Sequence, residues 1–181
     1  MRCHAVLLCL AIAASAAAAL ADDLADSDKQ FLQQAAKSGM AEIRLGDLAT
    51  QRTRSEDIRA LARDLVDKHS QNQQLLDLAR RLDFRLAEHR PDEKEQTLFD
   101  RMRGLAGQDF DRIYLHEVVL AHERDVARFR KAADEARNPA VKAFAAQSLL
   151  QLEKHLQVAK DLEARQSPTE GTGSSTAKPR P

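Results

Sequence analysis

The stretch NPAVKAFAAQSLLQLEKHLQVAKDLEAR, residues 138–165, decides the fold class of this chain. Apolar residues recur in it at intervals of three and four, which is the period of a helix with one buried face. Asn138 followed by Pro139 supplies a helix cap and a proline at the first helical position, where its missing N–H costs nothing. The buried stripe predicted from this spacing is Val141, Phe144, Ser148, Leu152, His155, Ala159 and Leu162.

Three further long segments have the same helical spacing. They cover residues 28–51, a stretch from just after residue 55 to about residue 82, and residues 108–136. A shorter helix is expected over residues 93–105, after a connection that contains Pro91. Gly39 and Gly46 fall near the buried stripe of the first helix, so we expect them to permit a close approach of helices and not to break it.

Composition supports the same fold class. The 181 residues include 43% hydrophobic but only 4% aromatic ones, and the chain is rich in the helix formers Ala, Leu, Gln, Arg, Glu and Lys. Its length suits a single domain. The 28 basic and 28 acidic residues cancel, so nucleic acid is not expected as a partner. The prediction is an all-α antiparallel four-helix bundle with a short extra helix between the second and third long helices.

The first 21 residues read as a signal peptide. A basic start at Arg2 precedes an Ala-rich apolar run, and the segment closes on Ala19-Leu20-Ala21 before acidic residues. The run is shorter than the ~20 strongly apolar residues of a membrane span, so we expect no transmembrane anchor after processing. Both cysteines, Cys3 and Cys9, lie in this leader. The expectation is an exported, periplasmic protein without disulfides.

The predicted domain organisation follows from these segments. Residues 1–21 are the leader, residues 22–165 the helical bundle, and residues 166–181, QSPTEGTGSSTAKPRP, a disordered tail. If the helices run up, down, up and down, the tight turns near Thr53 and Arg137 share one end of the bundle.

Each predicted stripe is interrupted near its middle by one polar group. These groups are Glu42, His69, His122 and His155. Counted from the two tight turns, the three histidines differ in depth by about 3 Å, and Glu42 lies roughly 6 Å nearer the turns at 1.5 Å of rise per residue. Three imidazoles are therefore expected in one layer with an acid close by.

Two interpretations of this layer remain open. Imidazole nitrogens and a carboxylate from four helices are suitable ligands for one divalent transition metal, namely zinc, iron, manganese or copper. Alternatively, the layer is a hydrogen-bonded polar layer whose role is structural, since buried polar groups need partners. Tyr114 is expected to pack with its hydroxyl hydrogen-bonded, and His116 to lie on the surface.

Several segments resemble a known family. AEIRLGDLA at residues 41–49, FDRIYL at 110–115, AHERDV at 121–126 and LLQLEKHL at 149–156 are similar to the ferritin-like family catalogued as domain of unknown function 4142. The resemblance covers residues 28–162. It implies an exported bacterial bundle with no assigned activity. Members commonly have Asp directly before the second-helix His, whereas here Lys68 separates Asp67 from His69.

A di-iron centre is disfavoured by the residues themselves. Such a site needs Glu-x-x-His on two helices, but Val66, Val119 and Leu152 stand three residues before the histidines. No phosphate loop or nucleophile motif is present, so no catalytic residue is assigned. A redox enzyme would require a bound metal with an open coordination position.

The sequence therefore predicts a protein that binds a metal ion or small ligand in the envelope stress response. The second hypothesis is a non-catalytic helical interaction module, whose layer is structural and whose outer faces or tail meet an envelope partner or another copy of the chain.

Overall fold

A computed structural model describes residues 24–67 and 69–166 of the chain. The predicted leader and all but the first residue of the predicted tail lie outside the described residues. Gln166, which the sequence assigned to the tail, is the last residue of a helix. The described helices are α1 (Asp26–Arg52), α2 (Glu56–Asp67), α3 (His69–Arg81), α4 (Glu93–Arg103), α5 (Gly107–Glu135) and α6 (Pro139–Gln166).

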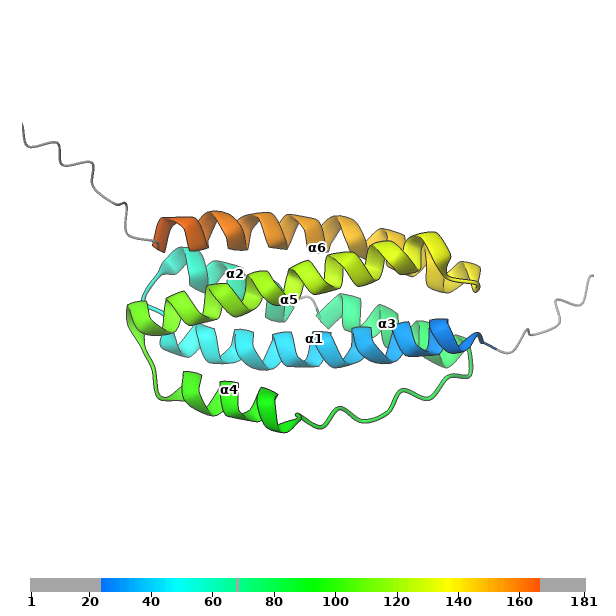
Figure 1. Cartoon of the computed structure of the whole chain (residues 1–181), viewed down its shortest axis with the longest axis horizontal. Coiled ribbons are helices and arrows are strands. Elements are labelled where there is room, and N and C mark those ends of the chain that lie inside the picture. The colour runs from blue at the N-terminus through cyan, green and yellow to red at the C-terminus, as the bar shows by residue number, and fades with distance from the viewer. Residues whose placement is uncertain (1–23, 68, 167–181) are drawn as a thin grey trace, which may run out of the picture.

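Four helical rods form the bundle, which confirms the predicted fold class. They are α1, the α2 and α3 pair, α5 and α6, and α4 is the short extra helix (Figure 1). α1 packs against α2, α3 and α5, while α6 packs against α5, α2 and α3, so each rod has two neighbours. None of the described helices is long and apolar enough to cross a membrane.

The two tight turns lie at opposite ends of the bundle, so the expectation that they share an end was wrong. Gly107, at the start of α5, lies next to Arg54 in the first turn. The backbone N–H of Asn138, in the second turn, donates to the Asp28 carboxylate at the start of α1 over 2.8 Å. Figure 1 shows α5 beginning where α1 ends. α5 therefore runs in the same direction as α2 and α3.

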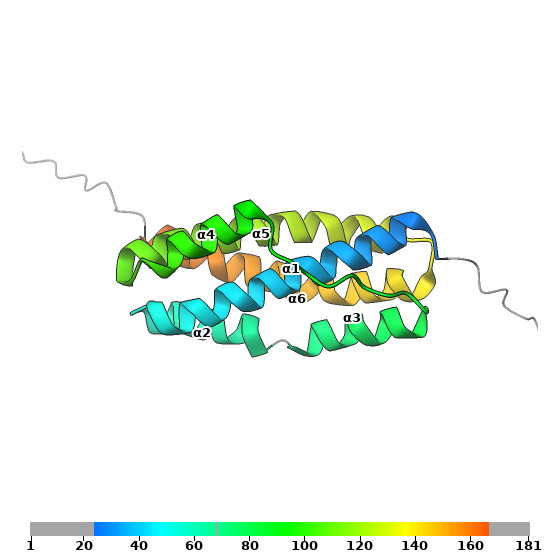
Figure 2. The same cartoon turned by 90° about the horizontal axis from the view of Figure 1, so that it is seen from below.

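The connection before α5 explains this topology. It runs alongside α1 in the same direction, because Gln33 bonds to Ala87, Lys37 to Asp92 and Arg44 to Gln96. Figure 2 shows the strand-like segment and α4 following α1 along the bundle. α1, with 27 residues at 1.5 Å each, is roughly 40 Å long. An extended segment followed by a short helix can span that length. One long crossover is the topology of ferritin-like bundles.

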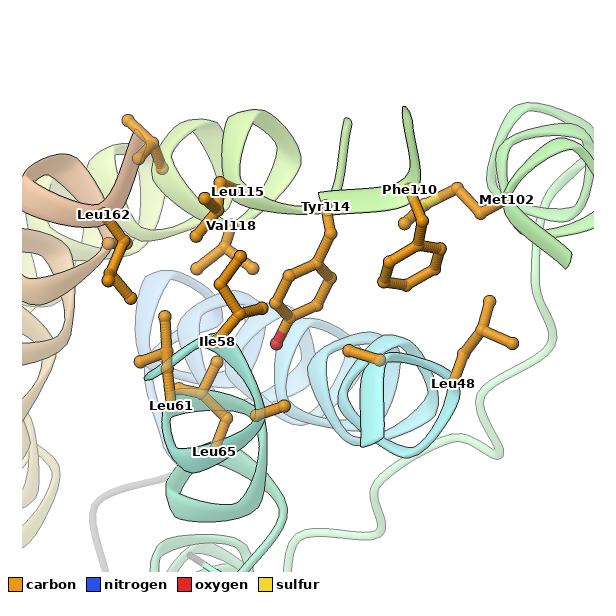
Figure 3. Packing of buried hydrophobic residues seen from close by; sticks show 14 residues of the cluster. Leu48, Ile58, Leu61, Leu65, Met102, Phe110, Tyr114, Leu115, Val118 and Leu162 are labelled. Carbon is orange, nitrogen blue, oxygen red and sulfur yellow. The ribbon is translucent and has the colours of Figure 1, made fainter. Parts of the chain in front are cut away.

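The core consists of two apolar clusters, one toward each end of the bundle. The first, around Ile58, Phe110 and Leu115, lies between α1, α2, α5 and α6. Figure 3 shows its side chains from α5 pointing toward those of α1 and α2. The second, around Leu32, Leu78 and Val141, lies near the other end. The polar layer predicted from the sequence lies between them.

Gly46 allows α1 to approach α2 closely, as the sequence predicted. A Cβ atom on Gly46 would lie 2.7 Å from Cγ2 of Val66 and 3.2 Å from the carbonyl oxygen of Ala62. Both distances are shorter than ordinary van der Waals contact. The two helices can pack at this separation because residue 46 has no side chain.

Candidate functional site

Four polar residues meet between the two apolar clusters. Glu42 comes from α1, His122 and Asp125 from α5, and His155 from α6. His122, Asp125 and His155 expose at most 4% of their surface, and the Glu42 side chain exposes 20%. We call these four residues the polar layer. Burial of so many ionisable groups is costly unless each finds a partner.

His122 is the most deeply buried of these residues, with no exposed surface. Its Nδ1 atom lies 3.0 Å from the carbonyl oxygen of Val118, one turn earlier on α5. A carbonyl only accepts hydrogen bonds, so Nδ1 carries the proton and Nε2 carries the lone pair. Nε2 has no hydrogen-bond partner among the described residues. Burial lowers the pKa of His122, and the Val118 bond and the Asp125 charge offset this only in part.

Glu42 lies beside His122 and Asp125. Its Oε1 atom is 3.9 Å from Nδ1 of His122 and has no hydrogen-bond partner among the described residues. Burial raises the pKa of Glu42 well above its ordinary value, and the charge and hydrogen bonding of Asp125 raise it further. Arg128 opposes this shift as the smallest contribution. Glu42 and Asp125 thus form a buried acid pair in which Glu42 keeps its proton.

Asp125 is the charged member of that pair. The Ser38 hydroxyl on α1 donates to its Oδ2 atom over 2.5 Å, and Arg128, one turn along α5, donates to Oδ1. These two bonds satisfy the buried carboxylate and link α1 to α5. The sequence placed Asp125 on the stripe of His122 but assigned it no role, because its partner Ser38 lies 87 residues away.

His155 contacts an acid that the sequence did not single out. Its Nε2 atom lies 3.1 Å from Oδ2 of Asp64 on α2 and 2.7 Å from the amide nitrogen of Gln151. The rings of His155 and His122 are 5.6 Å apart, edge to face at 72°. Asp64 gave no periodic signal because its side chain is half exposed, at 49%.

The predicted set of four residues is therefore partly assembled. Glu42, His122 and His155 meet in one layer, although Glu42 was expected roughly 6 Å away from the histidines. The side chain of His69 lies outside the described residues. Among the described side chains, no three of His, Asp or Glu are arranged to hold a metal ion. The complete metal set therefore stays a prediction.

The layer was predicted correctly although the turns were misplaced. His122 is 15 residues from both Gly107 and Arg137, so its depth is the same whichever end of α5 is used for counting. Glu42 is nearer one end of α1, so for Glu42 the choice of end matters. Because the turns lie at opposite ends, Glu42 is brought level with His122.

Tyr114 adds a third unpaired buried atom near Glu42. The sequence predicted a hydrogen-bonded hydroxyl, but this atom has no partner among the described residues, so that expectation was wrong. The ring stacks on Phe110, one turn earlier, with centroids 5.7 Å apart, and it fills the first apolar cluster (Figure 3). Burial, and then the Glu42 charge, raise the pKa of Tyr114. His116 is exposed, as predicted.

A small cavity adjoins the layer. It has a volume of about 40 Å³, whereas a water molecule needs roughly 10–15 Å³ of such space. Its polar wall consists of Glu42, Asp125, His155, Asn72 and Ser148. The layer therefore combines a lone pair on His122, a protonated acid and a space of molecular size. Such a group of residues can bind a small ligand or an ion.

Comparisons with known proteins support the fold. A family model described as "Domain of unknown function (DUF4142)" matches residues 13–162, which confirms the resemblance seen in the sequence. No curated protein matches the chain.

Two solved structures share the architecture. A DUF305 fragment from Deinococcus radiodurans has a TM-score of 0.69 at 19% identity, over 78% of this chain and 98% of that one. A "putative secreted protein DUF305" from Streptomyces coelicolor has a TM-score of 0.68 at 16% identity, over 80% of this chain and 96% of that one. At these identities the similarity demonstrates a shared helical fold and nothing about activity.

Proposed function

We propose that this chain, which belongs to the DUF4142 family of domains of unknown function, binds one divalent transition-metal ion in its polar layer. The ligands proposed are Glu42, His69, His122 and His155. The observation that carries the proposal is the Nε2 atom of His122, which is fully buried and has no hydrogen-bond partner among the described residues. A metal ion would take the lone pair on that atom.

The surroundings of His122 favour coordination. A histidine that binds a metal usually donates its other ring N–H to a carbonyl or carboxylate, which fixes the ring and its tautomer. Val118 plays this part for His122. Glu42 Oε1, which has no hydrogen-bond partner among the described residues, lies on the same side of the bundle. Zinc, iron, manganese and copper all accept imidazole together with carboxylate ligands.

Location and physiological role complete the proposal. The leader predicted from residues 1–21 directs the chain to the periplasm, and the description of the Streptomyces coelicolor protein as secreted supports export. Metal binding there would serve the envelope stress response. A deletion strain should then become more sensitive to excess or depletion of the bound metal, and expression of the triple variant described below should not restore it.

Elemental analysis tests the metal directly. Protein purified without a histidine tag should contain one metal ion per chain, and added Zn²⁺ should raise its melting temperature. A variant with His69, His122 and His155 all changed to Ala should lose both effects. The matched control changes His89 and His116 to Ala, because these pair with Glu95 and Glu163 and lie apart from the layer. No stoichiometric metal and unchanged melting would contradict the proposal.

A second candidate function rests on a separate observation. Ser38 and Arg128 satisfy Asp125, and Asp125 in turn contacts Glu42, so part of the layer is a closed polar network without any metal. In that case the layer sets helix register, and the chain is an interaction module for an envelope partner or a second copy. Apolar replacement of Glu42, His69, His122 and His155 together should then preserve or raise stability. A collapse of the fold would argue against this candidate.

A further inference from the structure

His155 is held by a carboxylate from another helix. Its ring is buried on α6, and Nε2 lies 3.1 Å from Oδ2 of Asp64 on α2. α2 and α6 are neighbouring helices, so this contact crosses the helix interface and not merely one helical turn. Asp64 lies at the rim of the interface with its side chain half exposed, at 49%.

The contact determines which nitrogen of the neutral His155 ring carries the proton. A carboxylate can only accept hydrogen bonds, so Nε2 donates to Asp64 and the lone pair lies on Nδ1. The Gln151 amide faces the same Nε2 atom, with its nitrogen at 2.7 Å. A half-turn of that amide presents its oxygen to Nε2 without changing the shape of the side chain, so Gln151 is compatible with this tautomer.

His122 and His155 therefore follow one pattern with opposite nitrogens. In His122, Nδ1 donates to Val118 and Nε2 carries the lone pair. In His155, Nε2 donates to Asp64 and Nδ1 carries the lone pair. A carbonyl in one case and a carboxylate in the other are the two common partners of metal-binding histidines. The rings lie 5.6 Å apart, so both belong to one site.

We infer that Asp64 is a positioning residue, which holds His155 in the tautomer and orientation that turn its Nδ1 atom into a ligand. This inference rests on the proposed function, since Asp64 prepares one of the proposed ligands. It adds a residue that the periodicity of the sequence does not mark. It also assigns α2 a role in the site that does not depend on His69.

The first experiment needs no metal. Long-range ¹H–¹⁵N correlation spectra of the labelled, chelator-treated protein report which nitrogen of each histidine is protonated. His155 should carry its proton on Nε2 in the wild type, move toward the Nδ1 form in Asp64→Ala, and return in Asp64→Glu. The control is Asp57→Ala, because Asp57 is an exposed acid on the same helix and pairs with Arg165. A proton on Nδ1 in the wild type, or an unchanged tautomer in Asp64→Ala, would overturn the inference.

The second experiment measures metal affinity. Titration with Co²⁺, followed by its visible absorption bands, should give a dissociation constant about 10–100-fold weaker for Asp64→Ala than for the wild type. Asp57→Ala should bind like the wild type. Melting curves of both variants, recorded without metal, establish that they fold. Equal affinity and equal spectra for Asp64→Ala and the wild type would overturn the role of Asp64.

The two proposals fail in different ways. If the wild type binds no Co²⁺, Zn²⁺ or other metal, the proposed function is wrong, while the tautomer measurement still decides whether Asp64 orients His155. If the wild type binds metal and Asp64→Ala binds it equally well, the function stands and the inference about Asp64 is wrong.

Discussion

Oδ2 of Asp28, on the first turn of α1, accepts a 2.8 Å hydrogen bond from the backbone N–H of Asn138, 110 residues later. Oδ1 of the same carboxylate accepts from the backbone N–H of Arg137 at 3.3 Å. Asp28 is 1% exposed, so these bonds are shielded from water. They tie the turn between α5 and α6 to the start of α1 and thereby set the end of the bundle at which that turn lies.

Replacing Asp28 with Ala should destabilise the fold. Two backbone N–H groups of the turn would lose their acceptor, and each unsatisfied buried group costs about 1–3 kcal/mol. Urea denaturation followed by circular dichroism should show a loss of about 2 kcal/mol or more. Asp26→Ala is the control, because Asp26 is exposed on the same turn of α1. Equal losses for the two variants would contradict this role of Asp28.

Glu42→Gln should stabilise the protein increasingly as the pH rises. Burial raises the pKa of Glu42 in the folded state above the unfolded value. The folded state therefore binds the extra proton, and its stability is greatest below the unfolded pKa and is lost as the pH rises through the folded pKa. Glutamine has no proton to lose. The melting temperature of Glu42→Gln minus that of the wild type should grow from pH 4.5 to pH 8.

The control for Glu42 is Glu123→Gln, which changes an exposed acid that pairs with Lys160. Its difference from the wild type should vary far less over the same pH range. A constant difference for Glu42→Gln would mean that Glu42 is ionised in the folded protein.

His122→Asn should remove a pH dependence of the opposite sign. Burial lowers the pKa of His122, so the unfolded chain binds more protons than the folded one at mildly acidic pH. In the metal-free wild type, the stability from His122 is present above about pH 6.5, the reference value, and is lost as the pH falls toward the folded pKa. Thermal melts with chelator from pH 8 to pH 5 should show a smaller decline in the variant.

Exposed His116 provides the control for His122. Changing His116 to Asn should leave most of the decline between pH 8 and pH 5 in place. If His116→Asn flattened the profile and His122→Asn did not, the acid sensitivity would belong to the surface and not to the layer.

Tyr114→Phe should preserve or raise stability. The phenol oxygen is buried without a hydrogen-bond partner among the described residues, and an unpaired buried polar group costs about 1–3 kcal/mol. Phenylalanine keeps the stacking on Phe110. Urea denaturation should show an equal or higher free energy of unfolding. A clear loss would indicate that the hydroxyl bonds to a water molecule or a ligand in solution.

Gly46→Ala should destabilise the α1–α2 contact. The new Cβ atom would meet Val66 and the backbone of Ala62 at distances too short for ordinary packing. Overpacking of this kind costs about 1–3 kcal/mol. At Gly104, by contrast, the nearest atom would be 3.5 Å away, so Gly104→Ala is a suitable control that should change stability little. Similar melting temperatures for the two variants would argue against close packing at Gly46.

The layer illustrates how far periodicity reaches. His122 and His155 were predicted together with Glu42, because a polar residue in an apolar stripe is visible from spacing alone. Asp125 lies on the same stripe, but its bond to Ser38 depends on how α1 and α5 face each other. Asp64 was invisible to this reasoning, since a half-exposed acid on an outer face resembles any other surface charge.

The sequence by itself determined the helices, their buried faces and the mid-helix position of the polar residues, because side-chain burial along a helix repeats with a local period. Only the tertiary structure decided the direction of α5, the level of Glu42 and the pairing of His155 with Asp64. Those features depend on contacts between residues 55 to 110 positions apart, such as Lys37 with Asp92 and Asp28 with Asn138, and no local pattern records them.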